Sequence, residues 1–160
     1  MCSSDLLSYL VPSDLRALVT YLRSIPAYNS GLPHVMTKPA PASYRQGVPE
    51  GLKNSRGEKI FAGTCASCHD WTGVSPVTKY ATLTGVRAVN DPSAANVAQI
   101  IINGVDRTTA QGTVFMPAFG YGYTDADIAA VSNYVTARFG AKGAQLTAKD
   151  VASLRQQAAQ

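Results

Sequence analysis

The stretch CASCH at residues 65–69 gathers two of the three cysteines and one of the two histidines of this 160-residue chain. The spacing Cys-x-x-Cys-His is the attachment signature of a c-type haem. In that chemistry each thiol adds to one vinyl group of the porphyrin, and the adjacent histidine is held under the iron as its proximal ligand. The sequence therefore predicts that Cys65 and Cys68 form thioethers to one haem and that His69 binds its iron through the imidazole.

A sixth iron ligand has to come from elsewhere in the chain, and electron-transfer cytochromes commonly use a methionine thioether. The chain has three methionines. Met1 is terminal and Met36 lies in a proline-rich stretch, whereas Met116 lies 47 residues after His69 in an expected loop and precedes Pro117. Met116 is therefore the predicted second axial ligand. With both ligands bound the iron keeps no open coordination site, which argues against catalysis.

Other uses of these residues stay open on the motif alone. A redox disulfide of the thioredoxin type requires a βαβ setting, and no such pattern surrounds the motif. A structural zinc ion requires four ligands, and the further candidates, His34 and Cys2, lie upstream in or before the proline-rich stretch. Met116 by itself also fits a side chain that fills a gap in a core.

Composition and charge narrow the class of protein. Apolar residues make up 46% of the chain and charged residues 15%, which is typical of a globular protein with little disorder. The net charge of +4 is spread along the chain with acidic residues between the basic ones, so no nucleic-acid footprint emerges. No apolar run is long enough to span a bilayer. Three cysteines cannot all pair, which makes a disulfide framework a poor interpretation.

An internal repeat joins the two ends of the chain. Residues 14–22 and 127–135 match at a constant offset of 113 positions, with aspartate, alanine and tyrosine at the first, fourth and eighth positions. Apolar residues occupy the second, fifth and ninth positions of both copies, which is helical spacing. Ser13 or Asp14 is expected to cap the first helix, and Thr124 or Asp125 the second. The first copy lacks a CxxCH, so we expect one complete unit preceded by the end of an earlier one.

The elements needed to position the motif follow from turn and cap signals. We predict a helix over residues 54–62, capped by Asn54 or Ser55, that leads into the cysteines, and a second helix that starts at 91–93 and stops at Gly104. A loop over 105–123 holds Met116, and a helix over 125–139 is ended by Gly140. Loops this long are unusual around so few helices, and a large apolar ligand at the centre would explain them.

The domain boundaries follow from these elements. We assign residues 1–25 to the remnant of a preceding domain, 26–49 to a linker with five prolines, and 50–140 to the complete unit. Residues 141–160 form an amphipathic helical tail that docks on the unit or on a partner subunit. Its three basic residues against one acidic residue give only a small charge excess, so membrane adhesion is the weaker interpretation.

The motifs together resemble class I cytochrome c domains: GEKIF at 57–61, CASCH, DPS at 91–93, MPAF at 116–119 and the repeat at 127–135. Residues 60–155 look more narrowly like the third, C-terminal haem domain of the three-haem cytochrome subunit of bacterial membrane-bound alcohol, sorbitol, gluconate or aldehyde dehydrogenases. The sequence segments that show this narrower resemblance are RAVNDPSAANVAQIIING and NYVTARFGAKGAQLTAKDV. PSDLRALVTYLRSIP similarly looks like the end of that subunit's second haem domain. Asp70 departs from the family, which more often has glycine there.

The resemblance implies an all-α fold, a small cytochrome c fold of three to five short helices around one covalently bound haem c. Its first and last helices would cross at Gly57, where Phe61 approaches Tyr134. Pro76 is a candidate for the proline whose carbonyl orients the proximal histidine, and a simple loop turn explains it equally well.

Two further residues are candidate haem contacts under the same resemblance. Tyr80 and Arg87 could reach the haem propionates. A surface arginine is more commonly solvated, and this is the alternative interpretation of Arg87.

The implied function is electron transfer rather than enzyme catalysis. The family passes electrons from a dehydrogenase catalytic subunit or upstream haem domains towards quinone or a terminal oxidase, on the periplasmic side, and its membrane association would here be indirect. The upstream haem domains and a signal peptide are missing, so we expect a fragment or truncated product, and whether residues 1–8 are native stays open. The alternatives are a haem enzyme or gas-binding sensor with an open sixth coordination site, and a structural subunit without haem.

Overall fold

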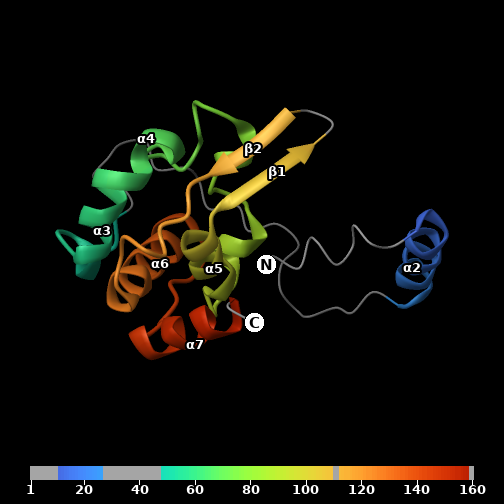
Figure 1. The fold of residues 1–160 in the computed structure, drawn as a ribbon. Helices are drawn as coiled ribbons and strands as arrows, with labels where there is room; N and C mark the ends of the chain where they lie inside the picture. The colour runs from blue at the N-terminus through green and yellow to red at the C-terminus, as the bar shows by residue number, and fades with distance from the viewer. Residues whose placement is uncertain (1–10, 27–47, 110–111, 159–160) are drawn as a thin grey trace.

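The computed structural model describes residues 11–26, 48–109 and 112–158. Most of the predicted linker lies outside these ranges, as do Met1, Cys2, His34 and Met36. The elements in chain order are α2 (Pro12–Ser24), η1 (Glu50–Leu52), α3 (Arg56–Ile60), η2 (Phe61–Cys65), α4 (Ala66–His69), η3 (Lys79–Ala81), η4 (Arg87–Asn90), α5 (Ala95–Asn103), β1 (Val105–Thr109), β2 (Gly112–Met116), α6 (Asp125–Phe139) and α7 (Ala148–Ala158). Figure 1 shows α3 to α7 gathered in one body.

The first helical segment of this body runs without a break from α3 through η2 to α4. Ser55 is the cap, because its Oγ accepts a hydrogen bond from the Glu58 backbone N–H (3.2 Å). The carboxylate of Glu58 in turn accepts from the backbone N–H of Asn54 (2.5 Å). The predicted start is confirmed, and the segment extends beyond the expected residue 62 to His69, with a wider π-type turn at η2. The cysteines therefore stand on a helix that continues from α3.

The segment is held by a close crossing with α6. A Cβ added at Gly57 would lie 2.2 Å from the Ala130 carbonyl oxygen, so only glycine lets the two backbones approach this far. Beside the crossing the ring centroids of Phe61 and Tyr134 are 5.4 Å apart, and Phe61 lies at the same distance from Phe139. All three rings are almost completely buried. The expected crossing at Gly57 is confirmed.

Helix α5 and the hairpin after it lie on the other side of the core. Gly104 ends α5 with φ of 69°, a left-handed conformation that favours glycine. The helix begins at Ala95 rather than at 91–93, because Asp91 Oδ1 accepts from the Ser93 N–H and hydroxyl and forms a turn first. Strands β1 and β2 then pair antiparallel, with Val105 opposite Met116.

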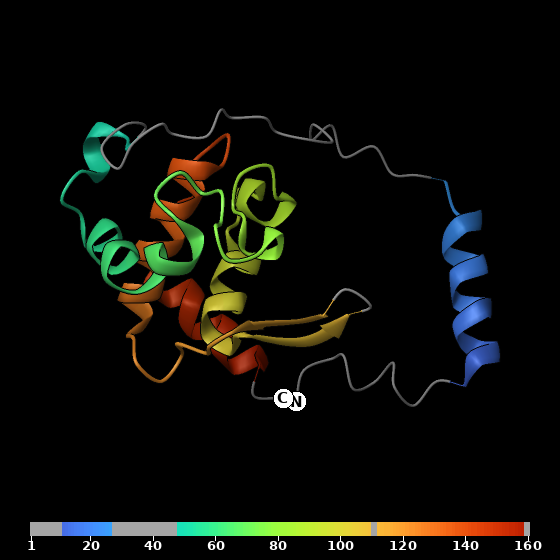
Figure 2. The same cartoon turned by 90° about the horizontal axis from the view of Figure 1, so that it is seen from above.

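The hairpin corrects the prediction of a loop over residues 105–123. Valine, threonine or phenylalanine occupies the strand positions 105, 108, 109 and 113–115, and such side chains fit a pleated ribbon. The ribbon extends away from the helices (Figure 2). The fold is otherwise mostly helical, as expected of a small cytochrome c fold.

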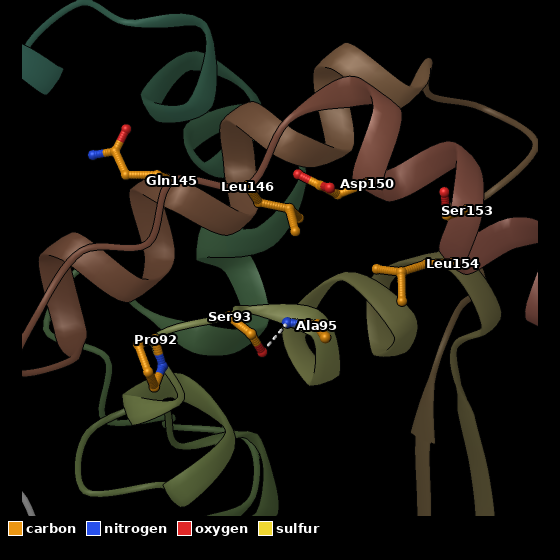
Figure 3. A pocket seen from close by; sticks show the side chains of 8 residues that line it. All are labelled: Pro92, Ser93, Ala95, Gln145, Leu146, Asp150, Ser153 and Leu154. Carbon is orange, nitrogen blue, oxygen red and sulfur yellow. Dashed lines mark hydrogen bonds between the residues drawn. The ribbon is translucent and has the colours of Figure 1, made fainter.

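The C-terminal part of the body consists of α6 and α7. Thr124 caps α6, as one of the two residues predicted for this role, and forms a capping box with Asp127. Gly140 ends the helix, as predicted. Helix α7 docks on the body through Val151, whose side chain is fully buried. A shallow groove separates α7 from the start of α5, with Leu146 and Leu154 extending toward α5 (Figure 3). The amphipathic tail is therefore part of the domain surface.

Helix α2 carries the first copy of the repeat. It starts at Pro12, and Val11 occupies the cap position without a side-chain hydrogen bond, so the expected cap by Ser13 or Asp14 is wrong. Proline at the first helical position needs no acceptor for an N–H and already has a helical φ, which explains the start. None of the residues of α2 is buried. Among the described residues, no helix is both long and apolar enough to cross a bilayer.

Candidate haem site

An apolar cavity of about 180 Å³ opens between the first helical segment, α5, the hairpin and α6. Three of the predicted iron or thioether residues line it: Cys65, His69 and Met116. The rest of the lining is almost entirely apolar and comes from residues 78–89, α5, β1, β2 and α6; it includes Phe61, Leu83, Val97, Ile101, Val131 and Val135. Residues as far apart in the sequence as Phe61 and Val135 therefore face one apolar space.

The two cysteines differ in their surroundings. Cys65 is partly buried, and burial raises the pKa of its thiol to about 11, with a smaller contribution from the Cys68 thiol. Cys68 is exposed and does not line the cavity. Their spacing of three residues on one helical segment places both side chains on the same face, with His69 next to them. A flat ligand bonded to both thiols would therefore have one edge near the surface.

The imidazole of His69 is oriented by a main-chain oxygen. Its Nδ1 lies 2.6 Å from the carbonyl oxygen of Ala81. A histidine that donates from Nδ1 keeps the lone pair on Nε2, which is the state that a metal ligand requires. The structure thus gives to Ala81 the role that the resemblance suggested for Pro76.

The loop between His69 and Ala81 explains why Ala81, and not Pro76, meets the imidazole. Ser75 Oγ donates to the Cys68 carbonyl oxygen (2.6 Å) and accepts from the Val77 N–H (3.1 Å), which folds the loop tightly at Pro76. Pro76 is exposed there and does not line the cavity. The chain returns to the imidazole only at η3, where it presents the carbonyl of Ala81. Pro76 is therefore a turn residue in this structure, and its contact with a haem stays a prediction.

Met116 is placed by the end of the hairpin and by Gly104. It is the last residue of β2, and its partly buried side chain packs against the core. A Cβ added at Gly104 would lie 2.5 Å from the Met116 carbonyl oxygen, so the two backbones are in close contact. The register of the hairpin and this contact fix where the thioether enters the cavity.

A family model described as Cytochrome c matches residues 55–138, which is more than half of the chain. The match includes Cys65, Cys68, His69, Ala81 and Met116. The chain belongs to the cytochrome c family. The prediction of a class I cytochrome c domain is thereby confirmed, and family membership implies a covalently bound haem with iron.

Three curated relatives are similar to this cytochrome over most of its length. The fructose dehydrogenase cytochrome subunit of Gluconobacter japonicus is 34% identical, and the gluconate 2-dehydrogenase cytochrome c subunit of Pantoea cypripedii is 29% identical; each alignment covers 93% of this chain and 34% of the relative. A nicotinate dehydrogenase subunit of Pseudomonas putida is 27% identical over 84% of this chain and 11% of the relative. The chain thus spans about a third of the first two.

The residues of this cytochrome fit a haem in two respects: the donor atoms described above and the apolar surface around the cavity. Four side chains on the cavity lining are large, apolar and still exposed: Tyr80 (40%), Val86 (39%), Ile100 (38%) and Phe115 (70%). Exposed apolar surface gathered around one cavity marks a binding site, because covering it removes it from water. A porphyrin held at the cysteines would cover such a rim.

The two remaining predicted contacts differ. Tyr80 lines the cavity. Arg87 is exposed and does not line it, although its neighbours Val86 and Ala88 do. A contact between Arg87 and a haem propionate therefore stays a prediction. Within the described residues no group of three or more His, Cys, Asp or Glu could hold a metal ion, and the further zinc candidates Cys2 and His34 lie outside those residues.

Sequence reasoning missed two features of the site. The Ala81 acceptor gives no signal, because every residue carries a carbonyl. The hydroxyl of Tyr123 lies 2.5 Å from Thr64 Oγ1, which joins the loop after Met116 to the residue before Cys65. This bond spans 59 positions, and only the folded chain brings its partners together.

Proposed function

We propose that this cytochrome transfers single electrons through one haem c, bonded to Cys65 and Cys68, with His69 and Met116 as the axial ligands. The observation that carries the proposal is that a thiol and an imidazole of one helical segment and a thioether from a distant part of the chain line one apolar cavity. Bound there, the haem supplies a one-electron ferric–ferrous couple. The protein makes and breaks no bond of an organic substrate.

The residues of the chain would tune this couple in three ways. The Ala81 carbonyl holds the proton on His69 Nδ1 and so fixes the ring and its tautomer. A thioether from Met116 favours the reduced state and raises the potential. The apolar lining, including Val97 and Val131, excludes water and stabilises the less charged state of the centre. Each effect is a static property of the fold, which suits a carrier that must reorganise little.

We also propose that the chain is part of a larger periplasmic cytochrome subunit that receives electrons from a dehydrogenase and passes them to quinone or the respiratory chain. Support comes from relatives named as cytochrome subunits of fructose and gluconate dehydrogenases, of which the chain covers a third. Helix α2 supports it independently. Its Tyr21 is 63% exposed, whereas the matching Tyr134 of α6 is fully buried. We assign α2 to the end of a preceding haem domain that would bury this face.

The test is the haem-loaded protein produced in a host that matures c-type cytochromes. A denaturing gel stained for haem should be positive for the wild type and negative when Cys65 and Cys68 are both replaced by alanine. The ferric protein should show the weak red absorbance band of an iron–thioether bond, and Met116→Leu should abolish it. A wild type that lacks the band and binds carbon monoxide readily would instead support a gas-binding or catalytic haem with an open sixth site.

A further inference from the structure

The loop that follows Met116, residues 117–124, is held on two sides. On one side the backbone N–H groups of Phe119 and Gly120 donate to the carbonyls of Ile101 (2.9 Å) and Ile102 (3.1 Å), which belong to the last turn of α5. Those carbonyls have no partner within their own helix, so the loop satisfies them. On this side the loop is part of the core that the family model covers.

On the other side the loop is held by Arg155 of α7. Its Nη1 donates to the carbonyl of Gly120 (2.6 Å) and its Nη2 to the carbonyl of Tyr123 (2.8 Å), while Nε donates to Asp125 Oδ1 (2.5 Å). The side chain is 29% exposed, so these are not bonds of a freely solvated surface group. One guanidinium thus joins two points of the loop and the first residue of α6. A planar fork with several donors can do this, whereas the single ammonium of lysine cannot.

Helix α7 is a firm base for this arginine. Val151 is fully buried in the core, and the Leu154 carbonyl accepts from Gln99 Nε2 of α5 (3.0 Å). Before the helix, the side-chain amide of Asn133 donates to the Leu146 carbonyl and accepts from its N–H, both at 2.8 Å. The helix lies beyond residue 138, where the family match ends. It is therefore an addition that reaches back to the loop of the methionine.

The loop also touches the segment that carries the cysteines. The backbone carbonyl of Tyr123 accepts from Arg155, and its hydroxyl hydrogen-bonds with Thr64, the residue before Cys65. The guanidinium, the loop and the cysteine segment are thus connected through one residue. A shift of the loop would move Met116 away from the cavity and stretch these bonds together.

We propose that Arg155 is a positioning residue for Met116: α7 clamps residues 117–124 so that the thioether stays on the iron. The inference rests on the proposed axial role of Met116. It identifies α7 as a structural support for that bond, because loosening α7 would open the sixth coordination site. The clamp lowers the fraction of molecules in which the thioether is off the iron.

The test titrates the haem-loaded ferric 160-residue chain with imidazole. Imidazole binds where Met116 has left, so its apparent affinity follows the open fraction. We expect Arg155→Gln to raise this affinity about tenfold, equivalent to roughly 1.4 kcal/mol. Lys149→Gln is the matched control, since it removes one positive charge from an exposed position of the same helix and should leave the affinity unchanged. Arg155→Lys, which keeps the charge, should be intermediate and carries the test if the glutamine variant does not fold.

A double-mutant cycle with Met116→Ala separates the possible failures. If Met116→Ala alone leaves the imidazole affinity of the wild type unchanged, the axial role of Met116 is wrong. If Met116→Ala raises it but Arg155→Gln and Arg155→Lys behave like the Lys149 control, the clamp is refuted and the axial role stands. Arg155→Gln must also lose its effect in the Met116→Ala background. An effect of equal size there would mean that Arg155 acts on the cavity without acting through the methionine.

Discussion

Replacing Gly57 by alanine should weaken the domain at the crossing of α3 and α6. The new Cβ would lie 2.2 Å from the Ala130 carbonyl oxygen and 2.9 Å from Tyr134 Cβ. Both obstacles are close to or part of the backbone, so the helices must separate. Overpacking of a tight contact costs typically about 1–3 kcal/mol, and here the upper end applies. Alanine recovers about 1 kcal/mol of helix propensity, which leaves a net loss of about 2 kcal/mol.

The assay is thermal unfolding of the haem-loaded protein, followed by the fluorescence of the single tryptophan, Trp71. A loss of about 2 kcal/mol corresponds to a fall of roughly 10 °C in the melting temperature of a domain of this size. Gly63→Ala is the matched control. Gly63 lies in the same helical segment, and a Cβ there meets no atom within 4 Å. It should gain up to about 1 kcal/mol by propensity alone. Equal stability of the two variants would refute the reasoning about the crossing.

Three further changes test the site and its frame. Hydrogen bonds from Arg56 and from the cap residue Thr124 hold the pKa of Asp127 below its ordinary range. The stabilisation is therefore present above about pH 4 and is lost as the pH falls below it. The difference in urea midpoint between the wild type and Asp127→Asn should accordingly be smaller at pH 3 than at pH 6. Gly104→Ala should cost roughly 2–4 kcal/mol, because φ is 69° and a Cβ meets Met116, and should weaken the red thioether band; an unchanged band would contradict the placement of the methionine. Val151→Ala should cost about 1.5 kcal/mol for two buried methyl groups, and no loss in a urea titration would mean that α7 does not dock.

The parts of the fold that sequence reasoning reached are those set by local chemistry. The bounds of α6 follow from a capping box at Thr124 and a stop at Gly140, which are signals within a few residues of each helix end. The spacing of CASCH is fixed by the covalent chemistry it serves. Met116 could be chosen because few methionines compete with it. Each of these inferences needs no knowledge of distant contacts.

The features that were missed depend on pairing at a distance or on the backbone. The hairpin over residues 105–116 has a weak pattern, since its strands are short and only partly buried, and the helical family pattern outweighed its threonines and valines. Pro76 was assigned by its residue type, although a serine next to it folds the loop and leaves Ala81 to meet His69. Arg155 gave no signal at all, because its partners are carbonyls of Gly120 and Tyr123 that have no identity in the sequence.

The contact between His69 and the Ala81 carbonyl has an evolutionary consequence. Any amino acid at position 81 supplies the same oxygen, so the side chain there does not decide how the imidazole is oriented. What must be conserved is the number of residues between the two positions, together with the turns that consume them. Homologues should therefore resist insertions and deletions between 69 and 81, whereas the side chain at 81 is limited only by the space in the cavity that it lines. Alanine scanning will pass over the hydrogen bond unnoticed.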